Sequence, residues 1–285
     1  MIEGLQVHRS FFSRLITANA GIADPDHPVV KAFASVPREH YLGIGPWQVL
    51  TAAGYIQTPS DHPALVYHDI VIALNREKQL NNGQPLLHAA ALAALAVNPG
   101  DVIVHVGAGT GYYTALLATL VGDQGRILAY EVEPELASRA KENLRGVSNV
   151  EVISGSGADA GLPACAAIYV NAGATGPLDL WLDSLVAGGR LLFPLTPAEV
   201  FGRPAAGMML LVTRSKEFRF DARFICQAAF TPCIGARDPE IAERLTVAFA
   251  KGDARSVRSL RRGGTPDATC WCSGQSWWLS TATLG

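Results

Sequence analysis

The spacing of hydrophobic residues divides the chain into two regions that meet near residue 85. Before residue 46, Leu5, Phe12 and Ile16 follow the three- and four-residue spacing of a buried helical face. This spacing predicts an N-terminal helical cap. Residues 46–80 mix Pro, Gly and Asp with short β-branched runs, which is typical of an extended or irregular lid.

From Pro85 onward, short apolar runs alternate with longer amphipathic runs. A short apolar run predicts a buried strand and an amphipathic run predicts a helix. Because the strands are apolar on both faces, the pattern predicts an α/β, Rossmann-like fold with a mostly parallel sheet and helices on both faces. Helices are expected at 85–97, 110–122, 133–146 and 176–189, and strands at 101–106, 126–132, 150–155, 166–173 and 189–195.

Beyond residue 205 this alternation stops. Two long strands around a polar turn at 207–230 predict an antiparallel hairpin, which brings the sheet to seven strands. A capped amphipathic helix is expected at 238–252. The basic run 255–262 is expected to be a solvated helix face rather than a docking site for an acidic partner. The aromatic segment CWCSGQSWWLS, residues 270–280, predicts a final strand or a packed terminal arm.

These elements suggest three parts of the chain. Residues 1–80 would form the helical cap and lid, and residues 81–230 the α/β domain. Residues 231–285 would add a C-terminal helix and tail that pack on the same domain.

The composition narrows the classes of partner. The 285 residues carry a formal net charge of −2, which gives no reason to expect nucleic acid or a membrane surface as a partner. The N-terminus lacks the apolar run of a signal peptide or anchor. Five cysteines, an odd number, indicate reduced thiols in a cytoplasmic protein. A zinc site is not expected, because the spacing does not contain two CxxC pairs. The composition leaves the oligomeric state open.

The stretch HVGAGTGYY, residues 105–113, predicts a nucleotide-type ligand. Gly107, Gly109 and Gly111 lie between a predicted strand and a predicted helix, where open α/β sheets bind ligands. A dinucleotide fingerprint would need glycine at position 112, but Tyr112 stands there. The spacing therefore favours a loop that curves around an adenosyl group with an amino-acid tail.

Glu131 is the side chain most clearly expected to touch such a ligand. It ends the next predicted strand, and a carboxylate there can accept hydrogen bonds from both ribose hydroxyls. The alternative is a solvated glutamate in front of the helix that Pro134 begins.

Four motifs in order resemble the class I S-adenosylmethionine-dependent methyltransferases, and among them the protein-L-isoaspartate O-methyltransferase family. The resemblance covers residues 36 to about 230 and implies S-adenosylmethionine as cofactor and a carboxylate of a peptide, protein or small molecule as acceptor. The motifs are VPREHYLG (36–43), GQPLLHAAALAAL (83–95), VGAGTGYYTALLATLVG (106–122) and LVAGGRLLFPL (185–195).

The resemblance also implies the cofactor contacts, with two departures. His105 stands where the family carries an acid that holds the cofactor's ammonium group or its bridging water, and a neutral imidazole can accept only one such bond. Ser156 replaces a second acid, which receives the adenine amino group; Ser156 can accept that bond, or Asp159 could. The implied cofactor-binding set is His105, Gly107, Ala108, Gly109, Thr110, Gly111, Glu131, Val132, Ser156, Gly157 and Asn171.

The predicted substrate loop departs further from the family. Asn81, Asn82 and Gly83, followed by Gln84, align with the family's Thr-Ile-Ser segment, so its hydroxyl groups are absent. The two amides can still donate hydrogen bonds. Gly83 leaves room for a bulkier acceptor or for close backbone approach. We therefore expect an altered acceptor rather than simple isoaspartate repair.

The chemistry limits the catalytic candidates. A carboxylate acceptor, with a pKa of about 4, is already ionised and needs no general base. An amine or phenol acceptor would need one, and His88 is a candidate, although it could equally be packed or solvated. Asn171 and Asn82 could orient the acceptor. A non-catalytic cofactor-binding protein stays an alternative, whereas Tyr112 argues against a nicotinamide-dependent oxidoreductase.

Overall fold

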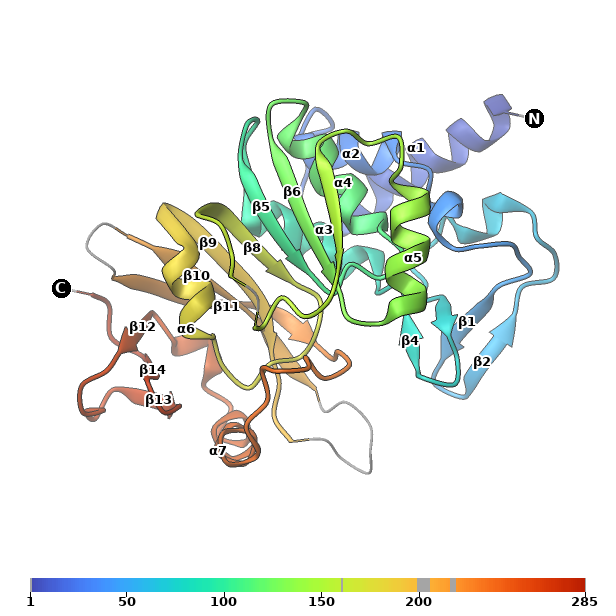
Figure 1. The fold of residues 1–285 in the computed structure, drawn as a ribbon. Coiled ribbons are helices and arrows are strands. Elements are labelled where there is room, and N and C mark those ends of the chain that lie inside the picture. Colours follow the sequence, from blue (N-terminus) through green and yellow to red (C-terminus); the bar gives the residue numbers. More distant parts are fainter. Residues whose placement is uncertain (1, 160, 199–205, 216–218, 285) are drawn as a thin grey trace. The chain divides into compact units, whose positions relative to one another are not determined.

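The computed structural model describes residues 2–159, 161–198, 206–215 and 219–284, and the chain forms two compact units (Figure 1). The first unit comprises Met1–Gly100 and Ala108–Gly155, and the second comprises Asp101–Gly107 and Ser156–Gly285. The chain passes from the second unit back to the first inside the glycine loop, between Gly107 and Ala108. None of the helices in the described ranges combines the length and the apolar character that a membrane crossing needs.

Two helices open the first unit, α1 (Ile2–Asn19) and α2 (Pro28–Ser35). They pack through the faces that the apolar spacing predicts. The rings of Phe12 and Phe33, both buried, meet edge to face with 6.3 Å between centroids. At the same contact the buried hydroxyl of Ser13 donates to the carbonyl of Val30 at 2.6 Å, which satisfies its hydrogen bond. The predicted N-terminal helices are confirmed.

The lid residues form small antiparallel pairs and one 3-10 turn. Strand β1 (Gln48–Thr51) pairs with β2 (Gly54–Gln57), and β3 (Ala73–Asn75) pairs with β4 (Leu80–Asn81). The 3-10 helix η2 (Pro63–Val66) lies between these pairs in the sequence. The extended and irregular character predicted for this segment is confirmed.

Arg38, also in the first unit, holds part of the segment predicted as a lid through hydrogen bonds to its backbone. It begins the 3-10 helix η1 (Arg38–Tyr41) and has no exposed surface. Its guanidinium donates to the carbonyls of Val66, His68 and Ile70 at 2.5, 2.8 and 2.7 Å. Burial lowers its pKa from the ordinary value. Because these carbonyls belong to one loop, a single side chain fixes the backbone from residue 66 to residue 70.

The remainder of the first unit alternates helices and strands as predicted. Strands β6 and β7 are parallel, with Glu131 aligned to Ser154, and α5 lies beside them (Figure 1). This pairing places Glu131 at the carboxyl end of its strand. The elements are α3 (Pro85–Leu95), α4 (Tyr112–Val121), β6 (Arg126–Glu131), α5 (Pro134–Asn143) and β7 (Val150–Ser154).

The second unit holds a mixed sheet. Strands β5 (Val102–Val106), β8 (Cys165–Val170) and β9 (Leu185–Leu195) are parallel neighbours. Strands β10 (Gly207–Arg214) and β11 (Phe220–Ala228) follow antiparallel to β9 and to each other. All seven predicted strands are therefore present in the two units. Residues 216–218 of the predicted polar turn lie outside the described residues.

The helix predicted at 176–189 is wrong in its second half. Helix α6 covers only Asp179–Ser184, and β9 begins at Leu185, which is aligned with Cys165 of β8. Gly189 lies so close to the backbone that a Cβ there would be 2.8 Å from the carbonyl oxygen of Val186. Pairing with β8 and the tight glycine passage override the helical spacing of these residues.

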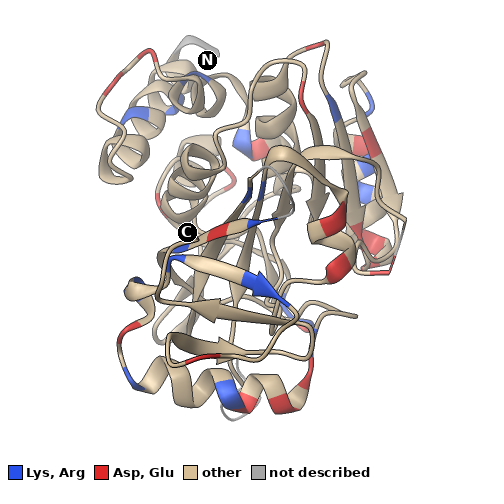
Figure 2. Ribbon diagram, turned by 90° about the vertical axis from the view of Figure 1, so that its left-hand side faces the viewer, with Lys and Arg blue, Asp and Glu red and all other residues tan. Residues whose placement is uncertain are grey.

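Three further strands extend the sheet of the second unit. Helix α7 (Pro239–Ala250) precedes them in the chain and begins as predicted, because Asp238 accepts hydrogen bonds from the N–H groups of residues 240 and 241. Charged residues of both signs lie along this helix (Figure 2), and they are exposed. The strand order from one edge is β13, β14, β12, β11, β10, β9, β8, β5. The added strands are β12 (Ser259–Arg262), β13 (Cys270–Ser273) and β14 (Trp277–Ser280).

These strands correct two expectations. The run 255–262 is not a solvated helix face, because after the short 3-10 helix η4 (Ala254–Ser256) it forms β12. Leu260 is buried there and is aligned with Phe220 of β11. The aromatic segment forms two strands rather than one strand or an arm. Strand β12 pairs with β11 and β14, and β13 pairs with β14, so long-range strand pairing overrides the local polar pattern of these residues.

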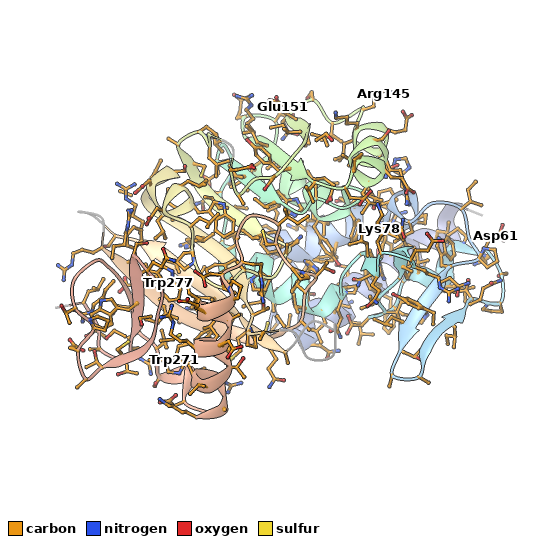
Figure 3. The ribbon with its side chains drawn as sticks, turned by 60° about the horizontal axis from the view of Figure 1, so that its bottom comes forward. Asp61, Lys78, Arg145, Glu151, Trp271 and Trp277 are labelled. Atoms are coloured by element: carbon orange, nitrogen blue, oxygen red, sulfur yellow. The ribbon has the colours of Figure 1, made fainter. Side chains whose placement is uncertain are left out.

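The tail is locked to the same unit by Trp277. A Cβ placed on Gly176 or on Gly274 would lie 2.6 or 2.5 Å from Cε2 of its indole, so the ring lies between two bare glycines. Arg262 adds ion pairs to Asp179, at 2.9 Å, and to Asp183. Figure 3 labels Trp277 together with Trp271, whose ring meets those of Phe224 and Phe249.

Candidate functional site

The glycines of the loop after β5 take backbone conformations that disfavour other residues. Gly107, Gly109 and Gly111 have φ angles of 78°, 59° and 96°, in the left-handed region where a Cβ is unfavourable. A Cβ on Gly111 would also lie 2.7 Å from Cδ1 of Leu144. The GxGxG spacing is therefore a backbone requirement of the turn.

Several N–H groups of this loop bind protein acceptors. The N–H of Ala108 donates to the carbonyl of Tyr130 at 3.0 Å, and that of Gly111 donates to the carbonyl of Ala108 at 2.9 Å. The hydroxyl of Thr110 donates to the carbonyl of Tyr41 at 2.6 Å. These groups shape the loop, and because each already has a protein acceptor, none of the three is available to a ligand.

Glu131 is tied to the glycine loop through its carboxylate. Its Oε2 accepts the N–H of Gly109 at 2.7 Å and its Oε1 accepts the N–H of Glu133 at 2.9 Å. The side chain is buried, and burial raises its pKa although both N–H groups act in the opposite direction. A carboxylate has about four acceptor positions, so this anchoring leaves lone pairs for ribose hydroxyls. Val132, the next residue, is exposed.

Tyr112 is a core residue and does not shape a ligand site. Its ring is 2% exposed and packs against Phe33 and Tyr41, with centroids 6.2 and 5.6 Å away. The ring therefore stands at this position to fill the contact between α4 and the N-terminal helices. Tyr112 therefore bears on the ligand only because it stands where a dinucleotide fingerprint would need a glycine.

The side-chain amides of Asn81 and Asn82 hold the backbone of the predicted substrate loop. Oδ1 of Asn81 accepts the N–H of Gly83 at 2.9 Å. Asn82 is buried, and its Oδ1 accepts the N–H of Ile72 at 2.8 Å. Its Nδ2 has no hydrogen-bond partner among the residues that the structure describes. Asn82 thus keeps one buried donor available in the loop.

Asp69 was not singled out by the sequence, yet it organises the start of α3. Its Oδ1 accepts the N–H of Leu86, in the first helical turn, and its Oδ2 accepts Nε2 of Gln84, both at 2.8 Å. A carboxylate is favourable at a helix N-terminus. Asp69 lies 15 residues before Gln84, so no local capping pattern could reveal it.

The space beside Gly83 is filled by His88, which corrects the expectation of room for a bulkier acceptor. A Cβ on Gly83 would lie 2.9 Å from Cδ2 of His88 and closer still to Nε2. His88 is 1% exposed and stacks on Tyr113, with 3.5 Å between centroids and 14° between planes. The close approach expected at Gly83 is real, but it is made by this ring.

In the second unit, His105 and Asn171 form a polar pair. Nδ2 of Asn171 lies 2.8 Å from Nε2 of His105, which also stacks on Tyr169. His105 has no exposed surface, and burial lowers its pKa to about 3. The imidazole is therefore neutral near pH 7. Oδ1 of Asn171 is buried and lacks a partner within the described ranges.

Ser156 and Gly157 also have partners in the second unit. The hydroxyl of Ser156 donates to the carbonyl of Ile234 at 3.3 Å and accepts the N–H of Ala158 at 3.1 Å. The carbonyl of Gly157 accepts Nε1 of Trp181 at 2.8 Å. Asp159 is exposed.

The described parts of the chain contain no cluster of metal-binding side chains. No three His, Cys, Asp or Glu residues lie close enough there to hold an ion. All five cysteines are free, and Cys165, Cys233 and Cys272 are buried.

The family model and the relatives that match this chain carry the same family name. Residues 11–232 match the family model described as protein-L-isoaspartate(D-aspartate) O-methyltransferase. A relative of that name from Aeropyrum pernix is 32% identical over 215 residues, which are 73% of this chain and 72% of the relative. One from Thermotoga maritima is 29% identical over 177 residues, 60% of this chain and half of the relative.

A solved structure adds evidence on the fold. It is a Plasmodium falciparum protein assigned to the same family, in complex with S-adenosyl-L-homocysteine. It covers 80% of this chain and 98% of its own, with a TM-score of 0.60 and 18% sequence identity. At that identity the similarity shows the class of fold.

Proposed function

This chain belongs to the protein-L-isoaspartate(D-aspartate) O-methyltransferase family, which makes it an S-adenosylmethionine-dependent methyltransferase, and we propose that its acceptor is a carboxylate of a peptide, a protein or a small molecule. We further propose that this acceptor differs from a simple isoaspartyl residue. The first proposal rests on the burial of His88, and the second rests on the buried amide donor of Asn82.

The residues present fit the cofactor. The N–H groups of Gly109 and Glu133 fix the carboxylate of Glu131 at the end of its strand, and this carboxylate keeps acceptor positions to spare. In this proposal Glu131 accepts the ribose hydroxyls, Val132 contacts the adenine ring and Ser156 accepts the adenine amino group. The bound cofactor supplies a sulfonium methyl group. The protein's part is to hold the acceptor oxygen in line with it and to exclude water.

The burial of His88 is the observation that carries the choice of acceptor. An amine or phenol must lose a proton, and His88 was the candidate base for that step. The ring is 1% exposed and clamped between Gly83 and Tyr113, so it presents no surface to an acceptor. A carboxylate is already ionised at neutral pH, and its methylation needs only orientation.

Asn82 supports an altered acceptor. Its Oδ1 is held by the N–H of Ile72, which leaves Nδ2 as a buried donor in the substrate loop. We propose that this N–H group donates to the acceptor carboxylate, in place of the hydroxyls that the family carries. An amide is longer than a serine or threonine hydroxyl, so the same carboxylate would have to sit farther from the loop backbone.

The experiment offers labelled S-adenosylmethionine with a panel of isoaspartyl peptides, free carboxylates and amines. Methyl esters release their label in mild base, whereas N-methyl groups keep it, so the expected product is base-labile. Asn82→Asp keeps the bond to Ile72 but places a negative charge at the donor, and it should raise KM for the acceptor at least tenfold while cofactor affinity stays the same. Asn81→Asp adds the same charge one residue away, on an exposed side chain, and should act far more weakly.

Three results would contradict the proposal or a part of it. A base-stable product would point to an amine acceptor. Equal effects of Asn82→Asp and Asn81→Asp would remove Asn82 from acceptor binding. Cofactor binding without label transfer to any acceptor, including those in a cell extract, would favour the non-catalytic alternative.

A further inference from the structure

His105 and Asn171 meet because of the register of two parallel strands. His105 in β5 is aligned with Tyr169 in β8. Side chains alternate between the two faces of a sheet, so Asn171, two residues after Tyr169, projects from the same face as His105. The N–H of Asn171 donates to the carbonyl of Val106 at 2.8 Å, so this alignment continues beyond the end of β8.

The contact determines which atoms of the two side chains remain available. An amide nitrogen can only donate, so Nδ2 of Asn171 donates to Nε2 of His105, and the ring carries its single proton on Nδ1. Burial keeps the ring neutral. With Nδ2 turned to the ring, Asn171 directs its carbonyl oxygen Oδ1 away from it.

This oxygen is buried and has no donor in the described part of the chain. It belongs to a residue that packs closely on the first loop glycine, since a Cβ on Gly107 would lie 3.6 Å from Cβ of Asn171. A buried acceptor without a donor is unfavourable, and one beside a ligand loop indicates that the donor comes from a ligand.

We propose that Asn171, positioned by His105, replaces the missing acid of position 105, and that its Oδ1 accepts a hydrogen bond from the ammonium group of S-adenosylmethionine. The inference rests on the proposed function. In place of a charged carboxylate acceptor on β5, the chain thus offers the neutral amide oxygen of a residue that follows β8. His105 acts as a positioning residue, because its own acceptor nitrogen is occupied by Asn171.

Calorimetric binding of two adenosyl ligands tests this assignment. S-adenosylhomocysteine carries the ammonium group, and 5′-methylthioadenosine lacks the whole amino-acid tail. Asn171→Leu should weaken S-adenosylhomocysteine binding about tenfold. Asn171→Asp should strengthen it about tenfold, because a hydrogen bond between two charged groups replaces one in which only the ammonium group is charged. Both variants should leave 5′-methylthioadenosine affinity within about twofold. An aspartate can keep the pair, because His105 can shift its proton to Nε2 and donate.

The ratio of the two affinities decides the outcome. If both ligands weaken or strengthen together, Asn171 does not face the ammonium group and the inference fails. If neither ligand binds the unmodified protein, the proposed function itself fails.

A second measurement does not depend on any variant. Nitrogen-15 NMR of the unmodified protein should show the Nδ1–H tautomer of His105. The Nε2–H tautomer would mean that Asn171 turns its amide nitrogen toward the ligand, and this would also overturn the inference.

Discussion

Replacing Gly83 by alanine would push a methyl group into the ring of His88. The new Cβ would lie 2.9 Å from Cδ2 and closer to Nε2. The ring has little freedom to yield, because it is buried and stacked on Tyr113 at 3.5 Å. The backbone adds a second penalty, since φ at Gly83 is 72°. The substitution should therefore destabilise the first unit through two separable effects.

Both effects can be given a magnitude. A left-handed backbone costs a residue with a Cβ about 1–2 kcal/mol, and overpacking a tight site costs about 1–3 kcal/mol. Together they predict a loss of roughly 2–5 kcal/mol in the free energy of unfolding. In a protein of this size each kcal/mol lowers Tm by roughly 2–4 °C.

A double-mutant cycle separates the two effects. Urea unfolding is measured for Gly83→Ala, for His88→Ala and for both together. In the His88→Ala background the steric cost disappears, so Gly83→Ala should cost only the backbone penalty of about 1–2 kcal/mol. Gly109→Ala is the matched control, because φ there is 59° but its Cβ would meet only Cδ1 of Leu74 at an ordinary 3.6 Å. If Gly83→Ala costs the same with and without the ring, or no more than Gly109→Ala, the steric explanation is refuted.

Three other substitutions test buried polar groups. Burial lowers the pKa of His105 to about 3, so the unfolded chain binds a proton that the native protein does not. The free energy of unfolding should then fall by about 1.4 kcal/mol per pH unit from pH 6.5 toward 3 through this group, and His105→Gln should flatten that slope in urea titrations. Burial raises the pKa of Glu131, so the native protein holds its proton longer. The stability of the unmodified protein relative to Glu131→Gln should fall as pH rises through the interval between the unfolded and native pKa values. Arg38→Lys leaves a single ammonium for three carbonyls, whose hydrogen bonds are buried or partly buried, and should cost roughly 3–5 kcal/mol, with faster limited proteolysis between residues 60 and 70.

Each of these has a contrary result. An unchanged acid slope in His105→Gln would show that His105 is accessible to protons in the native protein. A Glu131→Gln difference that grows with pH would show that the backbone donors, not burial, dominate the pKa of that carboxyl. Normal proteolysis of Arg38→Lys would show that the lid holds its shape without the three carbonyl bonds.

Local sequence signals predict much of the fold. The strands β5 to β8 and helices α3 to α5 lie where apolar spacing places them, and most of them bury their apolar residues as that spacing predicts. Gly107, Gly109 and Gly111 could be recognised because their backbone angles exclude most other residues. Asp238 capped its helix as expected, since a cap acts over two or three residues.

Long-range contacts explain what the sequence could not predict. Leu185 leaves the helical pattern because it pairs with Cys165, and residues 259–262 form a strand because β11 offers an edge. Arg38 resembles a surface residue until its three carbonyl partners, about 30 positions away, are known.

Side-chain orientation was also beyond the sequence. The asparagines of the predicted substrate loop and the asparagine that follows β8 could be named as hydrogen-bonding residues. Partners such as Ile72 and His105 determine which amide atom of each asparagine forms a hydrogen bond within the protein and which atom remains without one. Gly83 could likewise be interpreted as leaving room for an acceptor or as allowing a close approach, because the sequence does not show that the ring of His88 lies beside it.

The place of Trp277 has a consequence for anyone who shortens this protein to the part that the family model matches. The family match ends at residue 232, but the indole fills the space above Gly176, and Arg262 pairs with both aspartates of α6. A chain cut after residue 232 would uncover apolar surface and leave two carboxylates facing each other without a cation. Such a fragment should aggregate or need added salt to stay in solution, although every family motif would still be in it.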